Sequence, residues 1–483
     1  MVRKETQTNQ RNKEEEGTDM IAFLENIDGV VWGPVTITLL FGTGILLSVI
    51  VKVVQTRKFF YAWKLISGKY DNPQDHGEIT HFQALCAALS ATIGTGNIAG
   101  VGTAVAVGGP GALFWMWITA MLGMGLKYGE CLLSLNYRTI HEDGTVSAGP
   151  MYYLERGLGK KWLGMLFALF AAIASFGIGN MVQANSVAEP VQTYFHIPKL
   201  MTGLVIGGLV YAVIVGGIKR IGHVASALVP FMTIFYILGS LWVILTNLEA
   251  VPEAFNLIIH DAFTGSAAVG GFAGAVVWQA IRFGVARGVF SNEAGLGSAP
   301  IAHGAAQTEE PVREGLVAML GPFIDTIVIC SMTGLVIILS GAYTSGKTGA
   351  VLTASAFDSA LPGIGGYIVA FGIIFFAFST AISWSYYGDR AVEYLFGKRL
   401  GPKMVTPYRV VFCLLLPVGA YMKLTFVWTL SDITNALMAW PNLIALIGLS
   451  PVIVKLTREY FADPDRVAGN RKQMETVILE TDP

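Results

Sequence analysis

Three long apolar runs, at residues 201–218, 228–246 and 363–382, constrain the fold of this chain most strongly. Each is close to the roughly 20 residues that a helix needs to cross the hydrocarbon core of a bilayer. The runs are continuously apolar and do not alternate, which excludes the strands of a transmembrane β-barrel. Charged residues make up only 13% of the 483, against about a quarter in soluble proteins. The sequence therefore predicts an all-α integral membrane protein with about eleven transmembrane helices.

The two ends of the chain differ from this apolar body. Residues 1–20 are polar and charge-dense, and because they lack an apolar core they do not form a cleaved signal peptide. We expect a disordered tail there, a transmembrane domain at 30–456, and a charged cytoplasmic tail at 457–483. The four cysteines lie in apolar segments without CxxC spacing, so buried thiols are expected rather than disulfides or a metal site. The net charge of −1 indicates no nucleic-acid partner.

Lysine and arginine are distributed unevenly between the loops, and this distribution sets the expected orientation. Nearly all of them lie in one set of loops, which alternates with loops that hold few. By the positive-inside rule the basic loops are cytoplasmic. With an odd number of helices, the N-terminus is then outside the plasma membrane and the C-terminus is cytoplasmic. The basic set comprises residues 55–80, 138–161, 219–220, 282–313, 390–409 and 455–472.

Setting the first helix aside leaves ten, which divide into two repeats of five at about 82–247 and 267–456. Each repeat opens on a segment rich in glycine, near residues 90–100 and near 270–288. Such interruptions at corresponding positions of two halves indicate broken helices and a transporter site at the membrane midplane. Because five is odd, the second repeat has inverted topology. The alternative for any single glycine is close helix packing through small-xxx-small spacing.

A broken helix offers two kinds of ligand to a solute. The half-helix that follows the break presents free N–H groups and a positive dipole end, which suits a carboxylate. The half-helix that precedes the break presents free carbonyl groups, which suit a small hard cation such as sodium. The residues alone therefore predict a solute with an amino acid-like anion, together with a cation.

A patch of hydroxyl groups in one apolar run supports the cation part of this site. Ser379, Thr380 and Ser383 lie within five residues, and Ser379 and Ser383 share a helix face. The alternative is that each hydroxyl bonds the preceding turn of its own helix.

Larger polar and aromatic side chains accompany the patch. Gln183 is an amide in a membrane segment, where it bonds either a neighbouring helix or the solute. Phe378 and Trp384 flank the hydroxyl patch and bound a small pocket. The alternative for Trp384 is simple packing or an interfacial anchor.

Four ionisable residues are candidate gating groups. Asp325 lies in an apolar run, and an intramembrane carboxylate is functional by default, the alternative being a structural pair with an arginine. Arg282, Arg287 and Glu293 flank the second predicted break, and we expect them to form a cytoplasmic gate. The alternative is that these three residues belong to a solvated loop.

Four short motifs occur in the chain: SNEAGLGSAP at residues 291–300, GTGNIAGV at 94–101, GPMYY at 149–153, and FST followed by WSYYG within 378–388. Together they closely resemble the alanine or glycine:cation symporter family over about residues 30–460. That family lies within the amino acid-polyamine-organocation superfamily. The resemblance therefore implies the five-plus-five inverted repeat of the bacterial leucine transporter, preceded here by one extra N-terminal helix.

The resemblance also implies a function and the residues that perform it. It implies a secondary symporter that imports alanine or glycine with sodium or, alternatively, with protons. Trp384 would keep the pocket small enough for alanine. The substrate-binding residues that it implies are Thr92, Gly94, Thr95, Gly96, Asn97, Gln183 and Trp384. The sodium ligands that it implies are Ser90, Ile93, Ala377, Ser379, Thr380 and Ser383.

Two other classes of membrane protein fit the sequence less well. A channel needs a continuous polar path through several helices, whereas here the polar groups gather at the midplane. A membrane-embedded enzyme needs a nucleophile with its base or a metal cluster, and the seven histidines form no HExxH motif or paired set. We therefore expect a transporter and not an enzyme.

Overall fold

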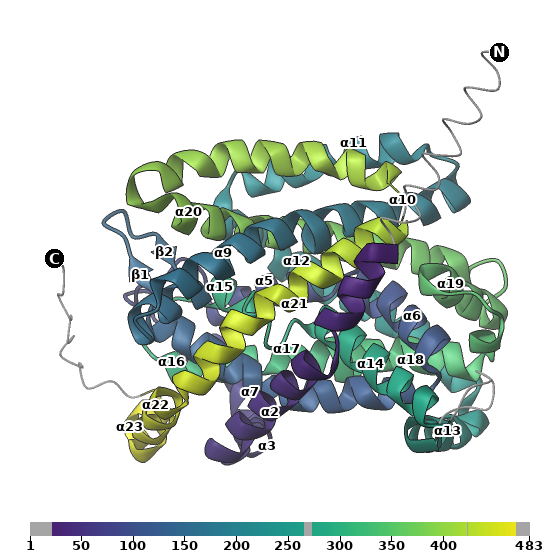
Figure 1. Cartoon of the computed structure of the whole chain (residues 1–483), viewed down its shortest axis with the longest axis horizontal. Coiled ribbons are helices and arrows are strands. Elements are labelled where there is room, and N and C mark those ends of the chain that lie inside the picture. Colours follow the sequence, from purple (N-terminus) through teal and green to yellow (C-terminus); the bar gives the residue numbers. More distant parts are fainter. Residues whose placement is uncertain (1–21, 265–272, 423, 470–483) are drawn as a thin grey trace.

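The computed structural model describes residues 22–264, 273–422 and 424–469, and these residues are mostly helical. Figure 1 shows a body built of packed helices, with two short strands at one edge. The strands, β1 (Thr139–Ile140) and β2 (Val146–Ser147), form one small antiparallel hairpin. The helical class expected from the sequence is confirmed, while the tail predicted at 1–20 lies outside the described residues.

Helices of membrane length make up much of this body. Within the described ranges, six are long and apolar enough to cross a bilayer, or eight if each of two bent pairs forms one span. The predicted number of eleven stays a prediction. The six are Ala22–Ile50, which includes α2 (Pro34–Ile50), and Lys161–Phe195, Gly217–Thr246, Pro311–Leu339, Gly365–Gly397 and Arg399–Tyr421.

The first predicted repeat opens on a helix that breaks halfway, as expected near residues 90–100. α5 (His81–Thr92) ends at Ile93, whose ψ of 88° is not helical. A π-helical turn at Gly96–Gly100 and α6 (Val101–Gly108) continue the chain in a direction that differs from α5 by 51°.

The second broken helix lies further along the chain than the sequence predicts. The described part of the segment at 270–288 belongs to one continuous helix, α14 (Ala273–Asn292). The chain leaves this helix only at residues 293–298, within the SNEAGLGSAP motif, and α15 (Ala299–His303) follows. The prediction of a break is therefore wrong for residues 273–288, while residues 270–272 lie outside the described residues.

Glycines serve different purposes in these two segments. Glu293, Gly295 and Gly297 have φ angles of 56°, 83° and 81°, in the left-handed region that favours glycine and ends a helix. In α14, by contrast, a Cβ on Gly284 would lie 2.5 Å from the backbone oxygen of Ala112. The glycines of α14 allow close packing, which is the alternative that the sequence left open.

The two broken helices run antiparallel and meet near their breaks. A Cβ on Gly96 would lie 3.1 Å from the Cα of Ser291, and a Cβ on Gly108 would lie 3.2 Å from the Cα of Ala280. As the residue numbers rise from Gly96 to Gly108, those of the contacting residues in α14 fall from Ser291 to Ala280, so the two helices run in opposite directions.

At the ends of α5 and α15 that lie away from the breaks, a buried cluster joins both helices to α16 (Pro311–Ala318). The Nδ1 atoms of His81 and His303 each lie 2.5 Å from a different carboxylate oxygen of Glu314. The expectation that the histidines form no paired set is therefore wrong for these two.

The first part of the predicted tail at 457–483 is folded. α21 (Leu424–Gly448) is followed, after a bend of 58°, by α22 (Ser450–Ala462) and then by α23 (Pro464–Ala468). Arg466 of α23 lies 2.6 Å from Glu310, so the chain is attached to the helical body almost to its last described residue. Figure 1 shows α21 running diagonally past α2, its neighbour, and ending in α22 and α23.

The remaining helices surround this centre. α20 (Gly365–Tyr421) turns sharply at Gly397, and it packs on α11 (Lys199–Ile214) along one edge of the molecule (Figure 1). The others are α3 (Val54–Arg57), α4 (Phe59–Leu65), α7 (Gly111–Asn136), α8 (Pro150–Tyr152), α9 (Lys161–Phe176), α10 (Val182–Phe195), α12 (Gly217–Thr246), α13 (Val251–Thr264), α17 (Leu320–Pro322), α18 (Ser331–Leu339) and α19 (Gly349–Ala360).

Candidate functional site

Asn97 stabilises the open backbone of the first break. Its Oδ1 accepts a hydrogen bond at 2.8 Å from the N–H of Gly94. Its Nδ2 donates at 2.7 Å to the carboxylate of Asp325, which lies in a π-helical turn and also accepts from Ser291 at 2.9 Å. A buried carboxylate requires such donors. Asp325 therefore connects the first broken helix to Ser291, in the last turn of α14 before the second break.

Two predicted cation ligands on α20 face the end of α5. The hydroxyl of Ser379 lies 3.2 Å from the carbonyl oxygen of Ser90, and that of Thr380 lies 3.5 Å from the carbonyl oxygen of Ile93. The hydroxyl of Ser90 donates at 2.7 Å to the carbonyl oxygen of Ser379. Carbonyl and hydroxyl oxygens are hard ligands of the kind that a small cation prefers.

Two buried hydroxyl groups near this contact have unused hydrogen-bonding capacity. Among the described residues, neither Thr95 Oγ1 nor Ser383 Oγ has a hydrogen-bond partner, although both side chains are buried. Nearly all buried polar groups have partners. A solute or an ion that contacts these two oxygens would satisfy them.

Gln183 contacts the first break from α10. Its Oε1 lies 3.4 Å from the backbone nitrogen of Thr95, and its Nε2 donates at 2.8 Å to the carbonyl oxygen of Ile178. A Cβ on Gly94 would lie 3.5 Å from that Oε1 and only 2.5 Å from Thr380 Oγ1. Three helices therefore converge where only glycine fits.

Trp384 is fully buried on α20 and is held by the second break. Its Nε1 donates at 2.7 Å to Glu293, whose other carboxylate oxygen accepts from Ser298 at 2.6 Å. A Cβ on Gly179 would lie 2.1 Å from the Cβ of Trp384, so the tryptophan packs directly on the backbone at Gly179. Glu293 thus takes part in positioning an aromatic side chain rather than in a solvated loop.

Arg282 and Arg287 lie in α14, before the second break. The early part of α14 packs beside the end of α6, near the loop before α7, because a Cβ on Gly108 would lie 3.2 Å from the Cα of Ala280. The basic loop at 55–80, by contrast, precedes α5. The expectation that these two arginines form a cytoplasmic gate stays a prediction, and the orientation predicted from the loop at 55–80 does not favour it.

Arg287 belongs to a buried ionic and aromatic cluster. It forms an ion pair with Asp432 of α21. Its guanidinium carbon lies 5.3 Å from the ring centre of Phe290 and 5.2 Å from that of Trp428, and these two rings stack at 4.8 Å. With only 7% of its surface exposed, Arg287 is not part of a solvated loop.

Three predicted site residues are less directly placed. Thr92 donates at 3.2 Å to the carbonyl oxygen of Leu89 in its own helix. Phe378 is half-buried and faces away from Thr380, because positions two residues apart differ by about 200° around a helix. Ala377 is buried on the same helix and offers only its backbone oxygen.

The sequence does not predict several partners of these residues. Ser291 and Asp432 are the clearest cases, together with Asp28, which lies 3.3 Å from Arg282. Asp432 interrupts an apolar run just as Asp325 does, so the same criterion would have found it. Ser291 carries no such signal, because serine is common in membrane helices.

The assembled geometry suits binding and not covalent chemistry. Backbone carbonyls of α5, hydroxyls of α20 and an amide of α10 converge on the first break, and a tryptophan is buried on α20. Such a site can hold a small zwitterion and a cation.

Comparisons with known proteins agree with this description. The profile of the sodium:alanine symporter family matches residues 18–475. An uncharacterized transporter of Haemophilus influenzae is 49% identical over 460 residues, which cover 95% of this chain and 99% of that protein. The sodium/alanine symporter AgcS of Methanococcus maripaludis is 48% identical over 450 residues, covering 92% of this chain and 97% of that one.

Solved structures add a likeness of fold. A structure of a Na⁺-coupled sialic acid symporter in a substrate-bound outward-open state matches with a TM-score of 0.51 at 13% identity. The match covers 80% of this chain and 82% of that one. The family profile and the relative AgcS confirm the expectation of a transporter rather than an enzyme, and they confirm the resemblance carried by the four motifs. The chain belongs to the sodium:alanine symporter family.

Proposed function

We propose that this sodium-coupled alanine symporter works by alternating access around its two helix breaks. The observation that carries this proposal is the antiparallel contact between the segment broken after α5 and the segment broken after α14, with the two breaks close together. It supports two inverted repeats of five helices, at about 82–247 and 267–456, within a transmembrane domain at 30–456. The helix that contains α2 is then the extra one. Eleven spans with cytoplasmic basic loops put the N-terminus outside and the tail at 457–483 inside.

The amino acid binds to the first break. The N–H groups of Thr95 and Gly96 start the half-helix that leads into α6 and attract the carboxylate. The Thr95 hydroxyl, which has no partner among the described residues, and the Gln183 amide contact the solute. Trp384 packs on Gly179 and limits the space for the side chain of the solute to that of alanine or glycine. Asn97 supports the break from behind, and Thr92 and Phe378 lie at the periphery of the site.

Sodium binds between α5 and α20. The carbonyl oxygens of Ser90 and Ile93 and the hydroxyls of Ser379 and Thr380 already lie close together. Ser383 adds a buried hydroxyl one turn further along α20, and Ala377 can add its backbone oxygen. Because this site shares the first break with the amino acid, occupancy by sodium orders the residues that bind the carboxylate.

Two barriers close the site in turn. The cluster of Arg287, Asp432, Phe290 and Trp428 forms the barrier on the extracellular side, with the ion pair of Arg282 and Asp28 beside it. Glu293, through its bond to Trp384, belongs to the barrier on the cytoplasmic side. Asp325 holds the two breaks together, so that they move as one unit.

Uptake of labelled alanine into proteoliposomes tests this function. One charge moving through 100 mV contributes about 2.3 kcal/mol, which corresponds to roughly 50-fold accumulation for each sodium ion. We expect accumulation only with an inward sodium gradient, and stronger accumulation with a negative interior. Uptake that is indifferent to sodium, or that a proton gradient drives equally well, would overturn the proposal.

A further inference from the structure

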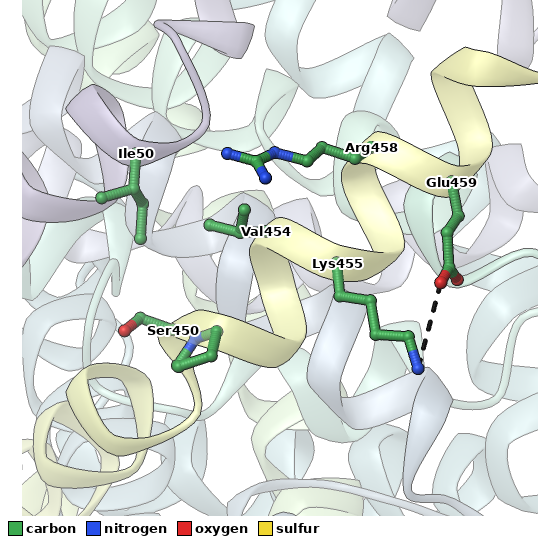
Figure 2. A pocket seen from close by; sticks show the side chains of 7 residues that line it. Ile50, Ser450, Val454, Lys455, Arg458 and Glu459 are labelled. Carbon is green, nitrogen blue, oxygen red and sulfur yellow. Dashed lines mark ion pairs between the residues drawn. The ribbon is translucent and has the colours of Figure 1, made fainter.

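A hollow lined by basic side chains lies where the peripheral helix α2 ends against α22. Its wall combines apolar residues of α2 and α22 with Lys455 and Arg458, and Figure 2 shows Arg458 extending across it towards Ile50. A second hollow shares Ile50 and Arg458 with the first and adds Lys52, Arg57 and Lys58. The hollows measure about 560 and 380 Å³, within the range of about 300–1,000 Å³ that is common for ligand sites.

The charge of this basic hollow is strongly one-sided. Its lining contains five cationic side chains and one carboxylate, Glu459, which lies 3.9 Å from Lys455. Arg57 and Arg458 have no ion-pair partner among the described residues, and both are exposed. The fold thus collects positive charge at one place without neutralising it, which favours an anionic ligand.

The backbone holds the cations in position at the end of α2. Lys52 and Val53 have φ angles of 56° and 53°, a left-handed conformation that is unusual for residues other than glycine. This turn ends the membrane helix at Ile50 and starts α3 at Val54, so Lys52 and Arg57 come to the same hollow as α22.

An apolar groove follows the same two helices away from the hollow. It is lined by one face of α2, including Gly42 and Leu46, and by Ile447 of α21. Leu46 and Ile50 are one helical turn apart on α2, and Ile447 and Ser450 are nearly one turn apart across the bend between α21 and α22. The groove therefore leads from the charged hollow into the depth of the membrane. Within it, a Cβ on Gly42 would meet no atom within 4 Å.

We infer that the basic hollow and the adjoining groove bind an anionic phospholipid, with its headgroup among the cations and an acyl chain along α2. Basic pockets between membrane helices on the cytoplasmic side bind anionic headgroups, and the basic loops put this end of α2 on that side. Five cations next to an apolar groove fit a diacyl lipid, whose headgroup and acyl chain occupy both. A soluble anion would occupy the cations alone and leave the groove empty. The site lies outside the transport pathway and links the peripheral helix to the C-terminal helices.

Lipid titrations of the purified full-length protein in neutral detergent test this inference. The probes are dioleoylphosphatidylglycerol, dioleoylphosphatidylcholine and inorganic phosphate, and the readouts are Tm and the number of lipids retained in native mass spectrometry. A ligand that binds only the folded state raises Tm with its concentration. We expect phosphatidylglycerol to raise Tm and to be retained, and phosphatidylcholine and phosphate to do neither.

Charge variants identify the site. A basic residue near an anionic surface contributes about five-fold in affinity, so the triple variant Lys52→Gln/Arg57→Gln/Arg458→Gln should bind phosphatidylglycerol roughly 100-fold more weakly. The matched control is Lys219→Gln/Lys403→Gln, two exposed lysines that do not line the hollow. Equal binding by the triple variant and the control would overturn the inference.

A variant that keeps every charge tests the groove. Gly42→Leu fills the groove and should reduce retention of phosphatidylglycerol several-fold, whereas Gly208→Leu should not. A Cβ on Gly208, on the exposed face of α11, also meets no atom within 4 Å. Stabilisation by phosphate alone, equal retention of phosphatidylcholine, or dimerisation through this face in light scattering would each contradict the lipid site.

Discussion

Ser90 and Ser379 exchange hydrogen bonds across the interface between α5 and α20. The hydroxyl of Ser90 donates at 2.7 Å to the carbonyl oxygen of Ser379, and the hydroxyl of Ser379 lies 3.2 Å from the carbonyl oxygen of Ser90. This exchange fixes α20 against the last turn of α5. The next residue of α20, Thr380, faces the carbonyl oxygen of Ile93. The proposed sodium site is thus built on a pre-formed contact, and any rearrangement of the break changes it.

Thr380→Ala should raise the sodium concentration needed for half-maximal uptake much more than it changes the preference between amino acids. A hydrogen bond to a charged group contributes about 1.5–3 kcal/mol, so a rise of about 10- to 100-fold is expected. Thr380→Ser keeps the hydroxyl and should stay close to the wild type. Ser385→Ala is the control on the same helix, because Ser385 donates only to the carbonyl oxygen of Ile382. An unchanged sodium dependence in Thr380→Ala would move the sodium site elsewhere.

Trp384→Ala should admit neutral amino acids larger than alanine. The fully buried indole occupies the space next to Gly179, and discrimination of one methylene group is worth about 1–3 kcal/mol. Competition of labelled alanine uptake by a series of unlabelled amino acids measures the change. Trp384→Phe separates size from hydrogen bonding, since it retains a bulky ring but loses the donor to Glu293. The same competition pattern in Trp384→Ala as in the wild type would remove Trp384 from the pocket.

Asn97→Ala should destabilise the protein as well as impair transport. It removes the acceptor for the N–H of Gly94 and one donor to Asp325, and a buried group left without a partner costs about 1–3 kcal/mol. Asn97→Asp should be worse, since it places a second carboxylate beside Asp325. The expected measurements are a lower Tm for both variants and slower uptake. If alanine affinity fell while Tm stayed at the wild-type value, Asn97 would act on the solute instead of on the break.

The first break was predictable because its signal is local. Gly94, Gly96 and Asn97 follow one another in a few residues, and Asn97 itself supplies the cap that the open backbone needs. The second break was misplaced because glycine has two uses that look the same in a sequence. Gly284 provides space for Ala112, whereas Gly295 provides a positive φ, and only tertiary contacts and backbone angles distinguish them.

The partners of the site residues depend on long-range packing and were less accessible. The sequence predicts the hydroxyl patch on α20, but not the hydrogen bonds that it exchanges with Ser90, 289 residues away. The sequence places Trp384 at a pocket wall, but no spacing rule connects it to Glu293, to which it donates a hydrogen bond. Local chemistry therefore indicated which residues matter, and the fold determined what each one touches.

The ion pair of Arg287 and Asp432 should show strong coupling in a double-mutant cycle. Removing one partner of a buried pair leaves an unpaired charge and costs about 3–5 kcal/mol. Arg287→Gln and Asp432→Asn should each lower Tm and uptake strongly, and the double variant should lose less than the sum of the two. The comparison pair is Lys455 and Glu459, whose exposed side chains lie 3.9 Å apart at the surface. The coupling between Lys455→Gln and Glu459→Gln should be small. Additive losses for Arg287 and Asp432 would mean that the two charges act independently.

Glu314→Gln should loosen the ends of α5 and α15 that lie away from the breaks. The carboxylate of Glu314 bridges His81 and His303 at 2.5 Å each, and an amide offers one acceptor oxygen in place of two. Cys86, buried in α5, reports on this end when the other three cysteines are replaced by alanine. We expect N-ethylmaleimide to label Cys86 several-fold faster in the Glu314→Gln variant than in the same background with Glu314. His141→Gln is the control, since His141 contacts Ser147 outside the cluster. Equal labelling with an unchanged Tm would show that the bridge through Glu314 does not hold this end closed.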